Sequence, residues 1–418
     1  MAYYRKQASL IDYRERDQTL AKALVMLNAF VLSTLLEQQL GLPNIVKYLL
    51  SLSVLWALTS YTLKAEKRFK GGLFIESIII VFTIYSFYLL VNSIRFELFF
   101  LQELFAEQFY FLPYLTPILL LRVSFGLSFF KKLIEWTYYL LPIAILVELY
   151  VISNALTQED YPINVVSILS FSLAPMLLLG TSHLNSKKHS QLLLLMYFLF
   201  FAFVTASLGR RGETLEILFM LSWGYWIKIK SSSISKSKRR LIITSGLVLF
   251  LGAGIFIADR KDDIFLFERG LSQEGFEESR GETVEMFLLD FGSRSGDWLF
   301  GRGLNGKIQK FDRGEEGKSR SIEIGYFNAL LKGGLLYLVP MIILLLSAFY
   351  LGYYSSNNDL SKLLAGFAFW QIFYMVTFGL PNFNFSYTFL WIAVSANLNP
   401  EFRKLNNLDL TRVLKLKN

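Results

Sequence analysis

Long apolar stretches alternate with short polar ones along the chain. The apolar blocks are roughly 17–25 residues long, the length that an α-helix needs to cross the hydrocarbon core of a bilayer. The pattern therefore predicts an all-α integral membrane protein with about twelve transmembrane helices. We expect them at residues 20–36, 43–63, 73–93, 108–125, 133–153, 163–181, 191–208, 213–229, 241–258, 324–350, 361–380 and 386–398.

The fourth predicted helix, at 108–125, is the least regular. It contains Pro113 and Pro117, which disrupt helical hydrogen bonding. The stretch before it, from Phe96 to Phe109, also fits an amphipathic helix that lies in the membrane interface.

One polar segment interrupts the apolar pattern. Residues 259–322 form the longest stretch between predicted helices and carry many charges of both signs. We expect an N-terminal membrane bundle at 1–258, with about nine helices and the Arg210-Arg211 turn. An extracytoplasmic loop with short helices follows at 259–322, then further membrane helices at 323–398 and a cytoplasmic tail at 399–418.

Basic residues predict the orientation. The net charge is +9, but Lys and Arg concentrate in alternate short connections, which is typical of the cytoplasmic side of membrane proteins. The basic segments are Arg5–Arg16, Lys64–Lys70, Lys131-Lys132, Lys187-Lys188, Lys228–Arg240 and Arg403–Lys417. This placement argues against nucleic-acid binding and predicts that both termini are cytoplasmic. The loop at 259–322 and the Arg210-Arg211 turn then share the outer face.

Composition narrows the possible chemistry. The chain is 54% hydrophobic with a mean hydropathy of +0.43, which favours a membrane protein over a soluble one. It has no Cys, so disulfides, thiolate metal sites and a Cys nucleophile are excluded. Its two histidines, His183 and His189, share one lysine-bearing loop, so we expect no metal and no cofactor. Residues 1–17 show no signal-peptide pattern.

The first candidate for substrate chemistry is the turn around Arg210 and Arg211, which glycines flank on both sides. Guanidinium groups present a rigid fork of donors suited to phosphate, and glycine lets a ligand approach the backbone closely. Arginine on the outer side runs against the usual charge bias. We therefore interpret this turn as binding an anionic, lipid-linked substrate. Snorkelling of the arginines to the interface is the alternative.

The second candidate is Arg280. The sequence Ser279-Arg280-Gly281-Glu282 has the spacing of a helix capping box. Apolar residues follow it at helical spacing, namely Val284, Phe287, Leu288 and Phe291. Arg280 is therefore expected to start a short amphipathic helix, where the N-terminus favours an anion. An ordinary loop helix with an exposed arginine is the alternative.

Two other features border the end of the loop. The run Asp297–Gly306 includes Gly301-Arg302-Gly303 and is expected to form a structural turn, because a lone glycine-rich run is a weak phosphate signal. Glu323 stands where the chain re-enters the membrane and is a candidate general base towards a sugar hydroxyl. The alternative is an acid that only stabilises a helix start. Other acids near predicted helix ends rank below it: Glu76, Glu135, Glu148 and Glu216.

In their order and placement these motifs resemble the Wzy-type O-antigen polymerase and O-antigen ligase superfamily, over residues 203–351. Arg211 stands in the place of the arginine that follows a middle helix in that family. Arg280 and Gly301-Arg302-Gly303 are similar to its loop arginine and Gly-x-Gly turn. The positions that fit the next family motif are Glu323-Ile324, Phe327, Leu330 and Gly333-Gly334. The chain departs from the family at Glu323, where ligases carry histidine, and at Lys332, where an acid is common.

The resemblance implies a metal-independent glycosyltransferase. It would polymerise undecaprenyl-pyrophosphate-linked oligosaccharides into O-antigen, capsule or exopolysaccharide at the outer face of a bacterial cytoplasmic membrane. Arg211 and Arg280 are the implied catalytic residues, and Glu323 joins them as the candidate base by its position, although the resemblance itself leaves the base unassigned. The implied binding residues for pyrophosphate or glycan are Arg210, Arg211, Arg280, Arg294 and Arg302. The lipid-linked oligosaccharide and membrane lipid are the expected partners, with a chain-length regulator and a flippase as further ones and no nucleic acid.

Two other functions compete with this interpretation. A ligase would transfer the finished glycan to lipid A core, and Glu323 in place of histidine counts against it. A transporter or flippase for the same lipid-linked sugar is expected to show internal repeats and polar groups near the bilayer midplane. The sequence shows no internal repeat and few charges at such positions.

Overall fold

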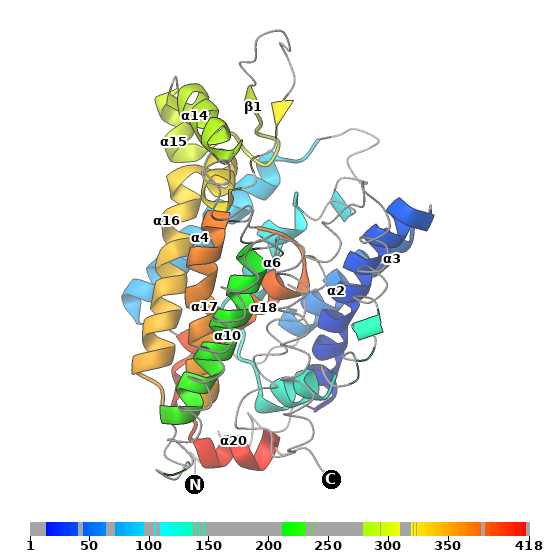
Figure 1. Ribbon diagram of the computed structural model, residues 1–418, viewed down its shortest axis with the longest axis vertical. Helices are drawn as coiled ribbons and strands as arrows, with labels where there is room; N and C mark the ends of the chain where they lie inside the picture. Colours follow the sequence, from blue (N-terminus) through cyan, green and yellow to red (C-terminus); the bar gives the residue numbers. More distant parts are fainter. Residues whose placement is uncertain are drawn as a thin grey trace, which may run out of the picture.

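In the residues that it describes, the structure, a computed structural model, has helices and one very short two-stranded ladder (Figure 1). It describes residues 14–40, 45–63, 72–95, 104–105, 109–136, 139, 142, 145–146, 211–230, 237, 279–292, 294–309, 319–320, 322, 324–377 and 381–414. Among these residues, three helices are long and apolar enough to cross a membrane: α3 (Ile45–Leu63), α4 (Leu73–Asn92) and α16 (Gly325–Tyr354). The predicted helical fold and membrane character are confirmed, whereas the count of twelve helices is not.

Most other described helices also lie where apolar blocks predicted them. They are α2 (Arg14–Leu40), α6 (Leu112–Leu120), α10 (Arg211–Lys230), α17 (Asp359–Thr377) and α18 (Phe385–Leu398). The polar segments contribute α14 (Ser279–Gly292), α15 (Ser295–Phe300), α19 (Pro400–Lys404) and α20 (Asn407–Leu414). The ladder pairs β1 (Ile308–Gln309) antiparallel with β2 (Ser319–Arg320). The predicted helices at 163–181, 191–208 and 241–258, and most of 133–153, lie outside the described residues.

The centre of the bundle is α18. All 14 of its residues are buried, and it packs against α2, α6, α16 and α17. Its Trp391 ring stacks on Phe82 of α4 with the centroids 5.3 Å apart, and its Phe389 ring lies 5.5 Å from that of Phe367 on α17. The Asn384 side chain caps the helix by accepting a hydrogen bond from the Tyr387 backbone N–H (2.8 Å).

The longest helix in the described part of the chain, α16, is broken. Gly334 has φ 60° and ψ −166°, a conformation that glycine reaches without the Cβ clash that other residues meet. The break divides α16 into a short first section and a longer second section. The second section packs along α17, and the first section carries the segment described next.

Different segments of the chain meet at the two ends of the bundle. At one end the Tyr61 hydroxyl at the close of α3 donates to Asp17 of α2 (3.1 Å), and Ser128 also donates to Asp17. Ser395 of α18 donates to the carbonyl of Val123 at the same end (2.9 Å). The C-terminal end of α10 and the helices α19 and α20 lie there too (Figure 1). We call this the basic end, because the described helices beside the basic connections meet there.

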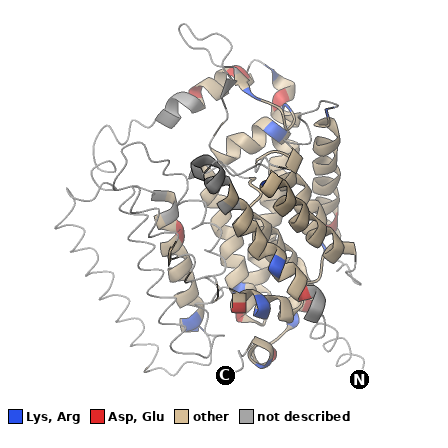
Figure 2. Ribbon diagram, turned by 90° about the vertical axis from the view of Figure 1, so that its right-hand side faces the viewer, with Lys and Arg blue, Asp and Glu red and all other residues tan. Residues whose placement is uncertain are grey.

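The opposite end carries a folded segment, residues 279–309, which comprises α14, α15, the following glycine-rich turn and β1. We call this segment the cap and this end the cap end. Figure 2 shows Lys and Arg mainly near the two ends, with largely uncharged helix between them. The predicted alternation of basic and non-basic connections therefore agrees with the ends at which the described helices begin and finish.

The fourth predicted helix differs from expectation in its form. Only the nine residues of α6 are helical, with Pro117 inside the helix. Nevertheless, the Tyr110 hydroxyl donates to the carbonyl of Ser93, just past the end of α4 (3.1 Å), and Arg122 pairs with Glu76 in the first turn of α4. The segment thus runs along α4 from Ser93 to Glu76, about 25 Å, as a short helix continued by non-helical chain. Of the alternative interfacial stretch 96–109, little is described.

Candidate functional site

The structure describes the predicted site residues unequally. Arg210 and Glu323 lie outside the described residues. Arg211 is the first residue of α10 and Arg280 the second residue of α14, and for both the structure describes the backbone alone. Arg294 and Arg302 are described with their side chains. Helix starts therefore locate Arg211 and Arg280, whereas side-chain contacts locate Arg294 and Arg302.

The start of α10 faces the cap end. Phe219 of α10 stacks on Trp370 of α17 with centroids 4.8 Å apart, and the Trp223 indole N–H donates to the carbonyl of Lys362 (3.0 Å). These contacts make α10 antiparallel to α17. At 1.5 Å per residue, Arg211 lies about 12 Å beyond Phe219 and the end of α17 about 10 Å beyond Trp370, so the two helix ends reach a similar level.

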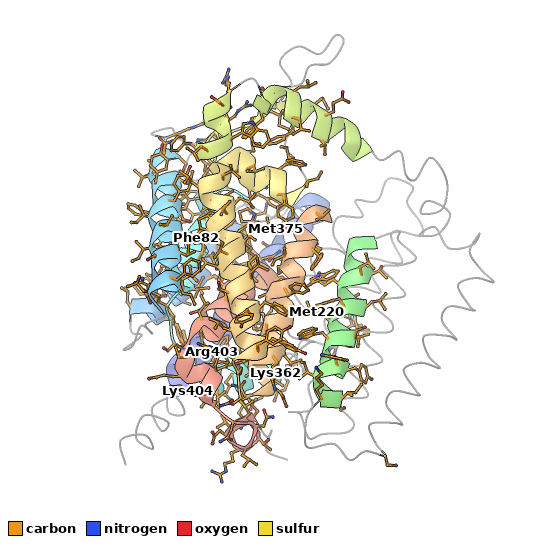
Figure 3. All side chains as sticks on the ribbon, turned by 90° about the vertical axis from the view of Figure 1, so that its left-hand side faces the viewer. Phe82, Met220, Lys362, Met375, Arg403 and Lys404 are labelled. Carbon is orange, nitrogen blue, oxygen red and sulfur yellow. The ribbon has the colours of Figure 1, made fainter. Side chains whose placement is uncertain are left out.

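The first turn of α16 lies close to that level as well. The Tyr326 hydroxyl donates to the carbonyl of Ile372 near the end of α17 (2.6 Å). Glu323 precedes the first residue of α16 by two positions. In Figure 3 the beginning of α14 also projects from the cap towards the side of the bundle where α10 lies. The starts of α10 and α14, which bear Arg211 and Arg280, and the start of α16, which Glu323 precedes in the sequence, therefore lie towards the cap end.

Aromatic packing holds the cap on α16. Phe287 and Phe291 of α14 are fully buried, and their rings stack with the centroids 4.5 Å apart. Phe287 also lies 4.7 Å from the ring of Phe327 in the first section of α16, and Trp298 of α15 meets Phe291 edge-on at 5.3 Å. The predicted amphipathic helix is confirmed, except that Leu288 is 46% exposed and lies outside the buried face.

Arg302 is bound by the cap itself. Its Nε lies 2.6 Å from Asp297 and its Nη1 lies 2.6 Å from Asp290, in ion pairs whose arginine side chain is 13% exposed. The guanidinium also donates to the carbonyls of Lys307 (3.0 Å) and Asp290 (3.2 Å), and it lies 5.2 Å from the centroid of Phe291. The hydrogen bond to Asp290, against the opposing effect of burial, raises the pKa of Arg302. The positive charge of Arg302 thus stabilises the fold of the cap.

The glycine-rich turn fits into the break of α16. Gly301 has φ +68°, and a Cβ added to it would lie 2.6 Å from the backbone N of Gly334. The Arg302 backbone N–H donates to the carbonyl of Leu331 (2.7 Å), so the turn supplies a hydrogen bond beside the interrupted helix. This backbone-to-backbone contact requires glycine at both positions.

Lys332 and α4 complete the contact between the glycine-rich turn and α16, which we call the cap joint. The Lys332 ammonium donates to the carbonyls of Leu304 (2.6 Å) and Gly306 (2.8 Å), which fastens the turn to α16 from the other side. The Tyr85 hydroxyl of α4 donates to the carbonyl of Phe300 (2.6 Å). The predicted structural role of the run Asp297–Gly306 agrees with these contacts.

Arg294 differs from Arg302. It is exposed at the start of α15, in the same cap, and the structure gives its guanidinium no ion pair within the described residues. A solvent-facing guanidinium is available to a phosphate in a way that the buried, doubly paired Arg302 is not. Of the two described arginines predicted to bind substrate, Arg294 therefore keeps that prediction, whereas Arg302 has the geometry of a structural residue.

Among the residues that the structure describes, the other acidic candidates do not join the cap end as a group. Glu76 pairs with Arg122, and Glu135 pairs with Lys132 (2.7 Å). Glu216 is buried in α10, and Glu148 is outside the described residues. Within the described part of the chain, no group of His, Asp or Glu side chains has an arrangement that could hold a metal ion.

Sequence reasoning missed the carboxylates that bind Arg302. Asp290 lies on the buried side of α14 between Phe287 and Phe291, and a lone acid inside an apolar helical face was the available signal. Asp297 opens the glycine-rich run itself. Sequence distance would have paired both with Arg294, which is nearer to each of them than Arg302, so the pairing with Arg302 depends on the fold.

Comparisons of the chain with protein-family models, with curated proteins and with solved structures find no match. The arrangement of the cap end and the motif residues are therefore the features that bear on its function.

Proposed function

We propose that the chain is a polysaccharide polymerase of the bacterial cytoplasmic membrane. It would span the membrane about twelve times, with both termini in the cytoplasm and the cap on the periplasmic side. Its substrates would be undecaprenyl-pyrophosphate-linked oligosaccharides, which approach through the bilayer. The observation that carries the proposal is that the helix starts bearing Arg211 and Arg280, and the one next to Glu323, all face the cap end.

The proposed chemistry depends on the groups at the cap end that can bind a pyrophosphate. Helix N-termini carry partial positive charge and backbone N–H donors that favour anions. Arginines beside them add bidentate donors. The acceptor hydroxyl would attack the anomeric carbon of the donor glycan, and the bond from that carbon to the pyrophosphate oxygen would break. Arg211, Arg280 and Arg294 would stabilise the charge on the departing undecaprenyl pyrophosphate, with Arg210 beside them. Glu323 would accept the proton of the hydroxyl.

Arg302 has a different part in this proposal. Its guanidinium holds Asp290 and Asp297, so it shapes the cap rather than contacting the substrate. Lys332 has a similar part, because its ammonium binds two carbonyls of the glycine-rich turn. Both residues would keep the first section of α16, and therefore the position of Glu323, in a fixed relation to α14.

The experiment uses a strain that lacks the gene and variants expressed in it. Loss of a polymerase is expected to leave surface material capped with a single repeat unit. Loss of a ligase would leave long polymer on the undecaprenyl carrier, and loss of a flippase would leave unpolymerised units on the inner face. Long carrier-linked polymer in the deletion strain would therefore overturn the proposal in favour of a ligase.

Arg211→Lys and Arg280→Lys test the pyrophosphate site. Each is expected to abolish polymer at normal protein level, because an ammonium cannot replace the planar fork of guanidinium. Arg412→Lys, an exposed arginine of α20 at the basic end, is the matched control and should retain full polymer length. Normal polymer from Arg211→Lys cells would contradict the assignment of that residue.

Glu323→Gln tests the general base. The amide keeps the shape of the side chain but cannot accept the proton, so turnover is expected to fall about 100- to 10,000-fold. The measurement is the rate of chain extension by purified enzyme with a lipid-linked substrate. A rate close to that of the parent would leave Glu323 as an acid that only stabilises the start of α16.

A further inference from the structure

The basic end carries a second arrangement of polar and aromatic side chains, far from the cap. Trp226 and Lys230, one turn apart on α10, meet Tyr353 near the end of α16. The Lys230 ammonium lies 4.5 Å from the centroid of the Trp226 ring and 5.8 Å from that of Tyr353. We call these three residues, with Lys362, the aromatic–lysine cluster.

The Tyr353 hydroxyl is the focus of this cluster. It accepts hydrogen bonds from the Trp226 indole N–H (3.0 Å) and from the Lys230 ammonium (3.3 Å). Two donors therefore occupy its acceptor side, which leaves its own proton for donation to a further group. An oxygen that carries negative charge is the partner that suits both this proton and the remaining N–H bonds of Lys230.

A second lysine, Lys362 of α17, has its backbone beside the cluster, and its ammonium pairs with Asp359 (3.4 Å). Trp223 packs against Tyr353 with the ring centroids 5.4 Å apart, and its indole N–H donates to the carbonyl of Lys362 (3.0 Å). Figure 3 labels Lys362 at this lower end of the bundle. The carboxylate next to Lys362 is Asp359, which also accepts a hydrogen bond from the Asn407 side chain (2.8 Å). The cluster thus combines two lysines with one carboxylate, which pairs with Lys362 and also binds the Asn407 side chain.

Exposed aromatic rings indicate the depth of the cluster in the membrane. Trp226 is 45% exposed, Tyr350 is 59% exposed and Tyr354 is 65% exposed. Trp and Tyr concentrate at the level of lipid headgroups, where one side of the ring meets acyl chains and its polar atom meets water. Lysine beside such rings is placed at the level of the lipid phosphate.

We propose that the aromatic–lysine cluster binds the phosphate of an anionic phospholipid headgroup. Lys230 and Lys362 would supply the charge, and the Tyr353 hydroxyl would donate a hydrogen bond to a phosphate oxygen. Trp226 would hold the hydroxyl in that orientation and contact the glycerol region. The cluster lies at the opposite end from the cap, so this binding is independent of the proposed polymerase reaction.

Lipid titration of the full-length protein in detergent tests the proposal. Short-chain phosphatidylglycerol, short-chain phosphatidylcholine and inorganic phosphate are added separately, and the midpoint of thermal unfolding is followed. Phosphatidylglycerol is expected to raise the midpoint in a saturable way, whereas the zwitterionic lipid and inorganic phosphate are not. For the double variant Lys230→Gln/Tyr353→Phe, the apparent Kd for phosphatidylglycerol should rise about ten-fold.

Lys404→Gln is the matched control, because it removes one cation from the same end of the protein without touching the cluster (Figure 3). It should retain the parent affinity. Three outcomes would overturn the proposal. They are an unchanged Kd in the double variant, an equal response to phosphatidylcholine, which would indicate a general aromatic belt, or an equal response to inorganic phosphate, which would indicate a site for free anions.

Discussion

The cap joint and the basic end fasten the same helix, α16, in different ways. At its start, aromatic packing is joined by a few critical groups: one arginine with two carboxylates, one lysine and one pair of glycines whose backbones touch. At its end, Tyr353 contacts Trp226 and Lys230, and neutral side chains just beyond the helix add further hydrogen bonds. Asn358, for example, donates to the carbonyl of Phe402 (2.9 Å) and accepts from the backbone N–H of Ser361 (2.8 Å).

The difference has an energetic consequence. A buried ion pair is expensive to break, because the remaining charge stays in a poorly solvated site. A neutral hydrogen bond contributes only about 1 kcal/mol, and its neighbours can persist without it. We therefore expect the cap joint to fail as a unit when one group is changed, and the basic end to lose stability in small steps.

The largest effect is expected from Arg302→Met. This change leaves Asp290, whose side chain is 7% exposed, without its guanidinium, and breaking a buried pair in this way costs about 3–5 kcal/mol. Hydrogen exchange of the amides of α14 and α15 measures the local stability of the cap. Arg294→Met, an exposed arginine of the same cap, is the control and should leave exchange unchanged. Equal protection in the two variants would contradict the contrast between the two ends.

An intermediate effect is expected from Gly301→Ala. The new methyl group would meet the backbone of Gly334, and the positive φ of Gly301 adds strain, so we expect a loss of about 2–3 kcal/mol. Limited proteolysis within residues 294–309 reports whether the turn has left the break in α16. Gly296→Ala is the control, since a Cβ there meets nothing within 4 Å. Resistance to proteolysis equal to that of the control would show that the backbone contact is dispensable.

The smallest effect is expected from Asn358→Ala at the basic end. It removes the cap of α17 and one hydrogen bond to Phe402, which together stabilise by about 1–2 kcal/mol. The matched change is Asn357→Ala, because the hydrogen bond of exposed Asn357 to Arg403 comes from its backbone N–H and survives. Exchange of the first amides of α17 distinguishes the two. A loss as large as that of Arg302→Met would remove the difference between the ends.

Apolar periodicity predicted the elements whose formation depends on local sequence. The blocks at 43–63, 73–93 and 324–350 correspond to α3, α4 and α16, because a bilayer-length apolar run has few alternatives to a helix. The capping pattern at Ser279 likewise predicted the start of α14. The short form of α6 was not predicted, since its extended continuation depends on contacts with α4 that lie outside its own sequence.

The candidate site was predictable only in part for the same reason. Gly301 was predicted as part of a turn and Gly334 as part of a family motif, but their mutual contact is a tertiary feature. Arg302 stood in a motif that resembled a substrate site, and the buried carboxylates that bind it come from α14 and α15. Charge in a sequence shows that a partner is needed, whereas the fold decides whether that partner is a ligand or a neighbouring side chain.

The burial of α18 bears on how this protein is made. A helix of 14 residues is about 21 Å long, shorter than the roughly 30 Å hydrocarbon core, and it carries Thr388, Ser395 and Asn397. The helices that enclose it, α2, α6, α16 and α17, all precede it in the chain. Of these five helices, α18 is therefore synthesised last, after the helices that enclose it. We expect its docking to depend on side-chain fit within the protein more than on partitioning into lipid.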